Sequence, residues 1–243
     1  MNHPDNRNAL NYNMVSDLIN AFNEVKGRDS VRAVVLTGAG SAFSAGADLK
    51  ALEALSSATF DENLQDSSRL AELFETIYRF PKVVIARING HAIAGGTGLA
   101  AVCDFAIASE EAKMGFTEVR IGFVPAIVMV FVTRKLREAD SRDLMLRGHL
   151  IQAAEAADMG LINMAVSADA LDDTVSELAL EIATMTSSQS IERTKRLLAE
   201  IQSMSISDGL KVAARENAEA RATEDCLAGI TAFLAKKTPP WQN

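Results

Sequence analysis

Apolar residues recur along the chain with two different periods, and the alternation between them predicts an α/β fold. Helical spacing over 12–26 and 64–79 predicts two amphipathic helices. Short, largely apolar runs bounded by turn residues predict buried strands, and shorter helices are expected between them. The expected strands cover 31–37, 83–88 and 105–108, and the shorter helices begin near Leu49 and cover 98–103. Strands that alternate with helices imply a parallel core with both faces covered.

The last quarter of the chain has only the helical period. Ser187 can cap a helix that runs to about Ile201, and further helices are expected over 208–222 and 225–237. No strand-like run follows Ser187. We therefore expect an α/β core over 1–186 that carries the site, and a helical region over 187–243.

Composition and charge narrow the classes of function. The chain has 243 residues, 48% hydrophobic and 23% charged, which is typical of a soluble globular protein. Its formal net charge of −8 argues against general binding of nucleic acid or of an anionic membrane. Two cysteines cannot form a disulfide framework, and no spacing of Cys, His or acidic residues resembles a metal site. We expect no metal and no separate cofactor.

The N-terminus is polar and resembles neither a signal peptide nor a transit peptide. The longest wholly apolar run, Val124–Val132, is too short to span a bilayer. A cytoplasmic protein without a membrane segment is therefore expected.

Two glycine-containing turns carry the strongest chemical signal, one over Ser44–Asp48 and one over Ala94–Gly98. Each is expected to follow a strand and to open a helix, which leaves unpaired N–H groups at the positive end of a helix dipole. Two such amides on one oxygen would form an oxyanion hole. Either turn alone is also explained as a tight strand-to-helix connection. Neither has the pattern of a dinucleotide- or nucleotide-phosphate loop.

The segments around these turns resemble the crotonase, or enoyl-CoA hydratase/isomerase, family. The similarity extends over nearly the whole chain and in the order of the family. It is carried by segments 4–10, 42–50, 89–96, 118–125, 153–166 and 224–241. Relatives usually have a strand pair before the first of these segments. Only three residues precede Pro4, so we expect either a truncated start or a sheet without that edge.

The resemblance implies a spiral of ββα units, a C-terminal helical trimerisation region and an acyl-CoA thioester substrate. It implies a homotrimer or a dimer of trimers, and it assigns the oxyanion amides to Ala47 and Gly95. Further positions are implied to contact the substrate, two of them sometimes across a subunit boundary. These positions are Arg7, Ala9, Ala45, Gly46, Asp48, Leu49, Lys50, Gly96 and, near the C-terminus, Phe233 and Lys236.

The carboxylates decide the reaction. Glu118 matches one of the two acids that hydratases of the family use, and the neighbouring apolar run should partly desolvate it. The position that corresponds to the second acid is occupied by Gly98, so that acid is absent. The nearby Asp104 is expected to have a structural role. The primary hypothesis is an enoyl-CoA hydratase-like lyase with Glu118 as its single carboxylate. A Δ3,Δ2-enoyl-CoA isomerase and a non-catalytic acyl-CoA-binding trimer are the alternatives.

Overall fold

Two four-stranded sheets form the core of the protein, as seen in a computed structural model that describes residues 1–242. The first sheet is parallel and has the order β1-β3-β5-β8. The second has the order β2-β4-β6-β7, and only its last pair is antiparallel. The strands are β1 (Ala33–Thr37), β2 (Ala42–Ser44), β3 (Val83–Ile88), β4 (His91–Ile93), β5 (Phe105–Ser109), β6 (Lys113–Gly115), β7 (Ile151–Gln152) and β8 (Met164–Val166).

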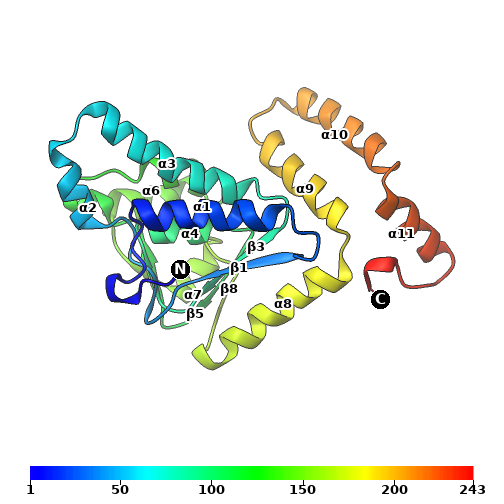
Figure 1. The fold of residues 1–243 in the computed structure, drawn as a ribbon, viewed down its shortest axis with the longest axis horizontal. Coiled ribbons are helices and arrows are strands. Elements are labelled where there is room, and N and C mark those ends of the chain that lie inside the picture. Colours follow the sequence, from blue (N-terminus) through cyan, green and yellow to red (C-terminus); the bar gives the residue numbers. More distant parts are fainter. Residues whose placement is uncertain (243) are drawn as a thin grey trace.

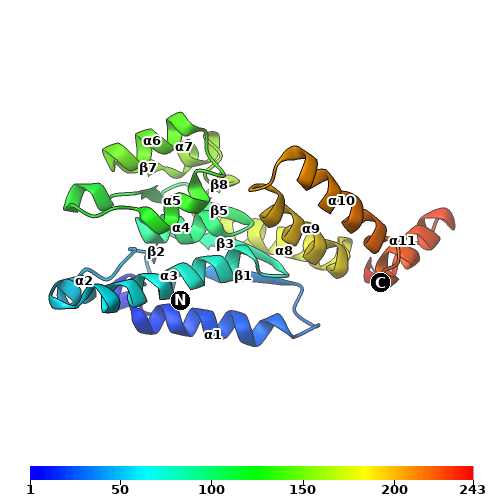
Figure 2. The ribbon, with the colours of Figure 1, turned by 90° about the horizontal axis from the view of Figure 1, so that it is seen from above.

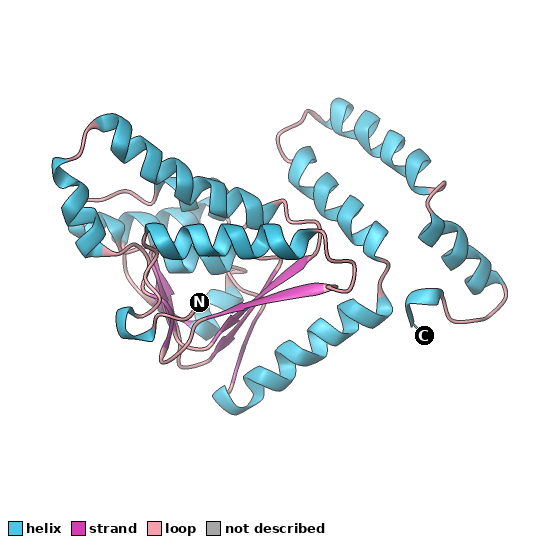
Figure 3. Cartoon of the chain, in the orientation of Figure 1, coloured by secondary structure: helices cyan, strands magenta, loops and turns pink. Residues whose placement is uncertain are grey.

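The strands β1, β3 and β5 of the first sheet are each followed along the chain by a short strand of the second sheet, namely β2, β4 and β6. β1, β2 and a helix form one unit, and β3, β4 and a helix form the next. The predicted spiral of ββα units is therefore confirmed (Figures 1 and 3). Because the strands run parallel, the turns after β2 and β4 lie at the same end of the second sheet.

The first sheet is covered on both faces, as its apolar composition requires. Val84, Ala86 and Ile88 of β3 pack into the main core, while Val83 and Ile85 pack into a smaller cluster on the other face. Edge strand β1 departs from the expectation of a buried strand, because Val35 is 42% exposed.

The helices of the core cover these faces and form the walls of the site. α1 (Tyr12–Lys26) is capped by Asn11, whose side chain accepts from the Met14 amide. α3 (Phe60–Tyr78) begins four residues earlier than predicted, because Thr59 and Glu62 form a capping box. The remaining core helices are α2 (Leu49–Ala54), α4 (Gly95–Val102), α5 (Ala126–Val132), α6 (Glu138–Arg147), α7 (Ala153–Asp158) and α8 (Leu171–Met185).

Three helices follow the core and extend away from the sheets (Figures 1 and 2). They are α9 (Ser188–Ile201), α10 (Ile206–Ala220) and α11 (Glu224–Leu234), close to the predicted ranges. The side chain of Ser187 caps α9, as the sequence predicts. None of the three contains a buried residue in this single chain. Among residues 1–242, no helix combines the length and apolar character needed to cross a membrane.

Candidate active site

The first turn connects β2 to α2 and is built around Gly46 and Asp48. Gly46 has a φ of +81°, a conformation that favours glycine. Asp48 caps α2 by accepting from the amides of Lys50 (2.9 Å) and Ala51 (3.3 Å). Its other oxygen accepts from the Asn6 amide group at 2.8 Å. Desolvation opposes its ionisation, but these hydrogen bonds outweigh that effect and the pKa of Asp48 lies below its usual value.

The second turn contains a strained alanine. Ala94 has φ 53° and ψ −121°, a region that non-glycine residues rarely occupy. It precedes α4, so Gly95 provides the first N–H of that helix. The Ala94 amide donates to the carbonyl of Gly115 at 2.7 Å, which fixes the turn against β6. Such strain costs about 1–3 kcal/mol and is found mostly at functional sites.

The two turns are in direct contact. A methyl group placed on Gly95 would lie 3.9 Å from the backbone nitrogen of Ala47 and 3.8 Å from Cα of Gly46. Within residues 1–242, neither the Ala47 N–H nor the Gly95 N–H donates to a protein acceptor. Two neighbouring free amides, one at the start of a helix, can stabilise a negatively charged oxygen. The geometry therefore supports the oxyanion hole inferred from the sequence.

Glu118 lies on a segment that is tied to the second turn. It begins the 3-10 helix η3 (Glu118–Ile121), three residues after β6. The Thr97 hydroxyl on α4 accepts from the Gly115 amide at 3.0 Å and lies 2.6 Å from the carbonyl of Ala92, so it links α4, β4 and β6. The segment that carries the acid and the turn that carries the Gly95 amide therefore form one hydrogen-bonded unit.

The carboxyl group of Glu118 is desolvated and only partly satisfied. The residue is 8% exposed, and its Oε2 atom is buried without a hydrogen-bond partner among the described residues. Burial raises the pKa of Glu118, opposed by a hydrogen bond from its own backbone amide. A buried carboxyl with a raised pKa is suited to proton transfer near neutral pH.

Gly98, where the resemblance implies a second acid, is tightly covered by α5. A methyl group at Gly98 would lie 2.2 Å from Cγ1 of Val128 and 3.0 Å from Cε1 of Phe74. The space that a side chain would need is thus already filled by apolar atoms. Asp104 does not replace the missing acid, because its Oδ2 atom accepts from the Val84 amide (2.7 Å) and from Nζ of Lys195 (2.5 Å).

A cavity of about 530 Å³ begins at the first turn and is large enough for an acyl group. Its walls come from α1, α2, α3 and the start of α5, with Ala47 at one side. The larger aliphatic residues and the phenylalanine among its lining are Leu10, Val15, Leu52, Leu55, Leu70, Phe123 and Ile127. α3 also contributes polar side chains. In the sequence they have the helical period of an ordinary solvated face, which gives no signal for a site.

The other residues predicted to contact the substrate near the N-terminus surround the first turn. The carbonyl of Arg7 accepts from the Ala45 amide at 2.9 Å. Ala9 is only 4% exposed, and the amide of the next residue, Leu10, donates to the carbonyl of Gly46 at 2.7 Å. Leu49 and Lys50, in the first turn of α2, are exposed. Gly96 is buried against Ser44, where a methyl group would lie 2.3 Å from the Ser44 carbonyl oxygen.

Phe233 and Lys236 are not brought to these turns within one chain. Phe233, on α11, is 83% exposed, and α11 lies at the opposite end of the molecule from α2 in both views (Figures 1 and 2). A contact with the site would therefore need α11 of a second copy.

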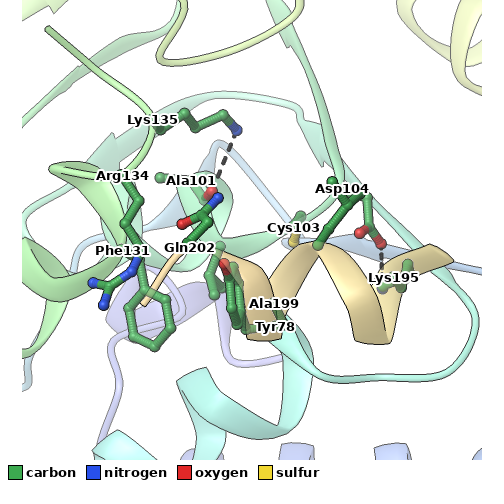
Figure 4. Close-up of a pocket in the computed structure, with 12 residues that line it drawn as sticks. Tyr78, Ala101, Cys103, Asp104, Phe131, Arg134, Lys135, Lys195, Ala199 and Gln202 are labelled. Carbon is green, nitrogen blue, oxygen red and sulfur yellow. Dashed lines mark hydrogen bonds and ion pairs between the residues drawn. The ribbon is translucent and has the colours of Figure 1, made fainter. Parts of the chain in front are cut away.

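A second cavity, of about 210 Å³, lies between α4, α5 and α9, away from the two turns (Figure 4). Asp104 and Lys195 form an ion pair on its wall, and Nζ of Lys195 also donates to the carbonyl of Lys82 at 2.8 Å. Burial raises the pKa of the neighbouring Cys103 thiol to about 12. A thiol with that pKa is unreactive at neutral pH, and the polar groups of this cavity connect α9 to the core.

Comparison with known proteins points to one family. The family model for enoyl-CoA hydratase/isomerase matches residues 1–243. A protein of Thermus thermophilus, provisionally named an enoyl-CoA hydratase, is 43% identical over 98% of this chain and 94% of its own length. A probable enoyl-CoA hydratase of Bacillus subtilis is 33% identical over 99% of this chain and 93% of its own.

Solved structures have the same fold. Pseudomonas aeruginosa AtuE superimposes with a TM-score of 0.94 at 31% identity, covering 99% of this chain and 93% of the other. An enoyl-CoA hydratase of Mycobacterium smegmatis gives a TM-score of 0.92 at 29% identity, covering 98% and 92%. With a family match over the whole chain and relatives above 30% identity, this protein belongs to the enoyl-CoA hydratase/isomerase family of the crotonase superfamily.

Proposed function

We propose that this protein adds water to a 2-enoyl-CoA thioester, with Glu118 as the single carboxylate of the site. The observation that carries the proposal is the contact between the two turns that hold the free amides of Ala47 and Gly95, the second of which is linked through β6 to a buried carboxyl group. The names of the relatives give additional support. The reaction requires no cofactor beyond the coenzyme A of the substrate.

In the proposed reaction, the Glu118 carboxylate accepts a proton from water as the water oxygen bonds to C3 of the substrate. The C2–C3 π electrons move into the thioester, and the resulting enolate oxygen is held by the two amides. Each donor of this kind contributes about 3–4 kcal/mol to stabilisation of a transition state. The enolate then takes the proton from Glu118 at C2, which restores the carboxylate and completes the addition of one water molecule.

The test is the rate of hydration of a panel of short and branched 2-enoyl-CoA thioesters. Glu118→Gln keeps the size of the side chain but removes the base, so we expect the rate to fall by about 10²–10⁴-fold. An unchanged rate in this variant would contradict the role given to Glu118. If the wild-type protein binds these thioesters tightly but converts none, it is a non-catalytic acyl-CoA-binding protein.

The contact between Gly98 and Val128 favours a second candidate, a Δ3,Δ2-enoyl-CoA isomerase. With apolar atoms where another acid would stand, one carboxylate could take a proton from C4 and return it to C2 without activating water. Conversion of a 3-enoyl-CoA without formation of a 3-hydroxyacyl-CoA would select this reaction over hydration.

We also propose that the chain forms a homotrimer or a dimer of trimers through its helical region. Large apolar side chains are exposed on α9, α10 and α11, a pattern that indicates a protein interface. These side chains are Leu198, Ile206, Leu210, Leu227, Ile230, Phe233 and Leu234. In such an assembly, Phe233 and Lys236 would reach the coenzyme A bound by Arg7, Ala45 and Lys50 of a neighbour. Light scattering of the purified protein tests the number of subunits.

A further inference from the structure

Two charged side chains on α3 face the acyl cavity and have unused hydrogen-bonding capacity. Asp66 and Arg69 both line the cavity that begins at Ala47, and both are half-buried. They are three residues apart, so they lie on adjacent turns of the same helix face. No hydrogen bond or ion pair joins them in the structure of residues 1–242.

Arg69 is anchored at one end and free at the other. Its Nη1 atom donates to Oε2 of Glu72 at 2.7 Å, which holds the guanidinium group in place. Its Nε atom is buried and has no hydrogen-bond partner among the described residues. A buried N–H without a partner is unfavourable, and a small rotation of the partly exposed Arg69 side chain toward the cavity would let a bound oxygen atom relieve that cost.

Asp66 supplies the complementary group. Two other acids line the cavity, but both are engaged locally: Asp48 caps α2, and Glu62 closes the capping box with Thr59. Among the described residues, no donor contacts the carboxylate of Asp66. The cavity thus presents one free acceptor beside one free donor on the α3 side, opposite the apolar side chains of Leu10, Leu52 and Ile127.

We propose that Asp66 and Arg69 form a subsite for a hydroxyl group on the acyl chain of the substrate. A hydroxyl can donate to Asp66 and accept from Nε of Arg69 at the same time, which uses both groups. A carboxylate in this place would be repelled by Asp66, with Asp48 and Glu62 on the same cavity. An alkyl chain would desolvate both groups and satisfy neither. This inference rests on the proposed function for its thioester end and adds the class of acyl group.

The experiment compares pairs of 2-enoyl-CoA thioesters of six, eight and ten carbons, each pair with either a methyl or a hydroxymethyl terminus. The wild-type protein should convert at least one hydroxylated member with a kcat/KM about tenfold above that of its alkyl partner. A 2-enoyl-CoA with a terminal carboxylate serves as a third probe at each length.

Two substitutions and one control locate the effect. Arg69→Met keeps the apolar stem but removes the donors, and Asp66→Leu removes the acceptor. Each should lower kcat/KM for the hydroxylated thioester more than for its alkyl partner, so that the preference between the two is lost. Arg79→Met is the matched control, because Arg79 follows the same helix, pairs with Glu75 and lies outside the acyl cavity. It should leave the preference intact.

The possible outcomes separate this inference from the proposed function. Equal conversion of both termini, or a preference for the terminal carboxylate, would overturn the hydroxyl subsite while leaving the thioester chemistry in place. Equal losses on both termini in Arg69→Met would also overturn it. Absence of turnover with every thioester in the panel would instead contradict the proposed function itself.

Discussion

Gly98 on α4 and Val128 on α5 fit together so closely that a single added methyl group at Gly98 would lie 2.2 Å from Cγ1 of Val128. Absence of a side chain at one position permits the branched side chain at the other. The residue next to Val128, Ile127, lines the acyl cavity. The Gly98–Val128 contact therefore fixes both the apolar wall beside the second glycine turn and the position of one side of the cavity proposed to hold the acyl group.

Gly98→Ala should destabilise the fold by about 1–3 kcal/mol, because the core must shift to accept the new methyl group. Combining it with Val128→Ala should restore part of the loss, so the two substitutions should be non-additive by about 1 kcal/mol. Urea denaturation of the two single variants and the double variant measures this coupling. Additive losses would show that Val128 does not limit the size of residue 98.

On the acid side of the pH–rate profile, the midpoint at which activity is lost should lie above the ordinary pKa of a glutamate. Burial raises the pKa of Glu118, and the proposed reaction needs its ionised form in the free enzyme. Activity should therefore decline as the pH falls through a midpoint above about 4.3, the value for an unperturbed glutamate. The measurement is kcat/KM between mildly acidic and neutral pH. A midpoint at or below the unperturbed value would contradict desolvation as the dominant influence.

Glu118→Gln should lose activity yet melt at a higher temperature than the wild type at neutral pH. A raised folded-state pKa means that the neutral form is favoured in the fold, so its stabilising contribution is complete below the unfolded pKa and is lost as the pH rises through the folded pKa. Glutamine remains neutral throughout. The difference in Tm should shrink as the pH is lowered, and a Tm below that of the wild type at neutral pH would oppose this account.

Lys195→Met should loosen the attachment of the helical region to the core. Burial raises the pKa of Asp104, and the ion pair with Lys195 opposes this shift, so removing the lysine leaves a costly carboxylate. We expect a loss of about 1–3 kcal/mol, below the range for fully buried pairs because Asp104 keeps some solvent exposure. Hydrogen exchange should increase in α9 more than in β3. Arg196→Met, which breaks an exposed pair with Glu216, is the control.

Ala94→Gly should raise stability while preserving catalysis. Glycine adopts φ 53° and ψ −121° without the steric cost paid by alanine, although it loses more entropy on folding. Because the strain term is the larger, we expect a net gain of up to about 1 kcal/mol and an unchanged kcat/KM. Thermal melting and steady-state kinetics check the two parts. A large fall in kcat with retained stability would indicate that the alanine methyl group itself positions the Gly95 amide.

The bounds of the helices were predicted most accurately where apolar residues recur with a clear helical period. α1 and α9 match the predicted ranges closely, because the helical period and, for α9, the Ser187 cap are local signals. The start of α4 was placed three residues late, since Gly95 and Gly96 resemble turn residues. The strands of the second sheet were missed, because two or three residues carry too little pattern and depend on pairing with distant segments.

In the candidate site, too, residues in local motifs could be predicted, whereas contacts between distant segments could not. The two glycine turns and Glu118 lie in contiguous motifs that could be recognised in the sequence, and the structure brings the two turns together. Val128 could not be identified, because its fit to Gly98 joins segments thirty residues apart. Asp66 and Arg69 have the spacing of an ordinary solvated helix face, so only the cavity indicates that they have a special environment.

The hydrogen bonds of Thr97 and Ala94 to Gly115 have a consequence for how this protein could diversify. They join the Gly95 amide and the Glu118 segment into one piece, whereas most of the acyl cavity is formed by α1, α2 and α3, which supply no reacting group. Under the proposed function, substitutions on those helices can alter which acyl chains are accepted without displacing Glu118 or the Gly95 amide. Substrate range and chemistry are thereby encoded in separate stretches of the chain, and selection can change one while it preserves the other.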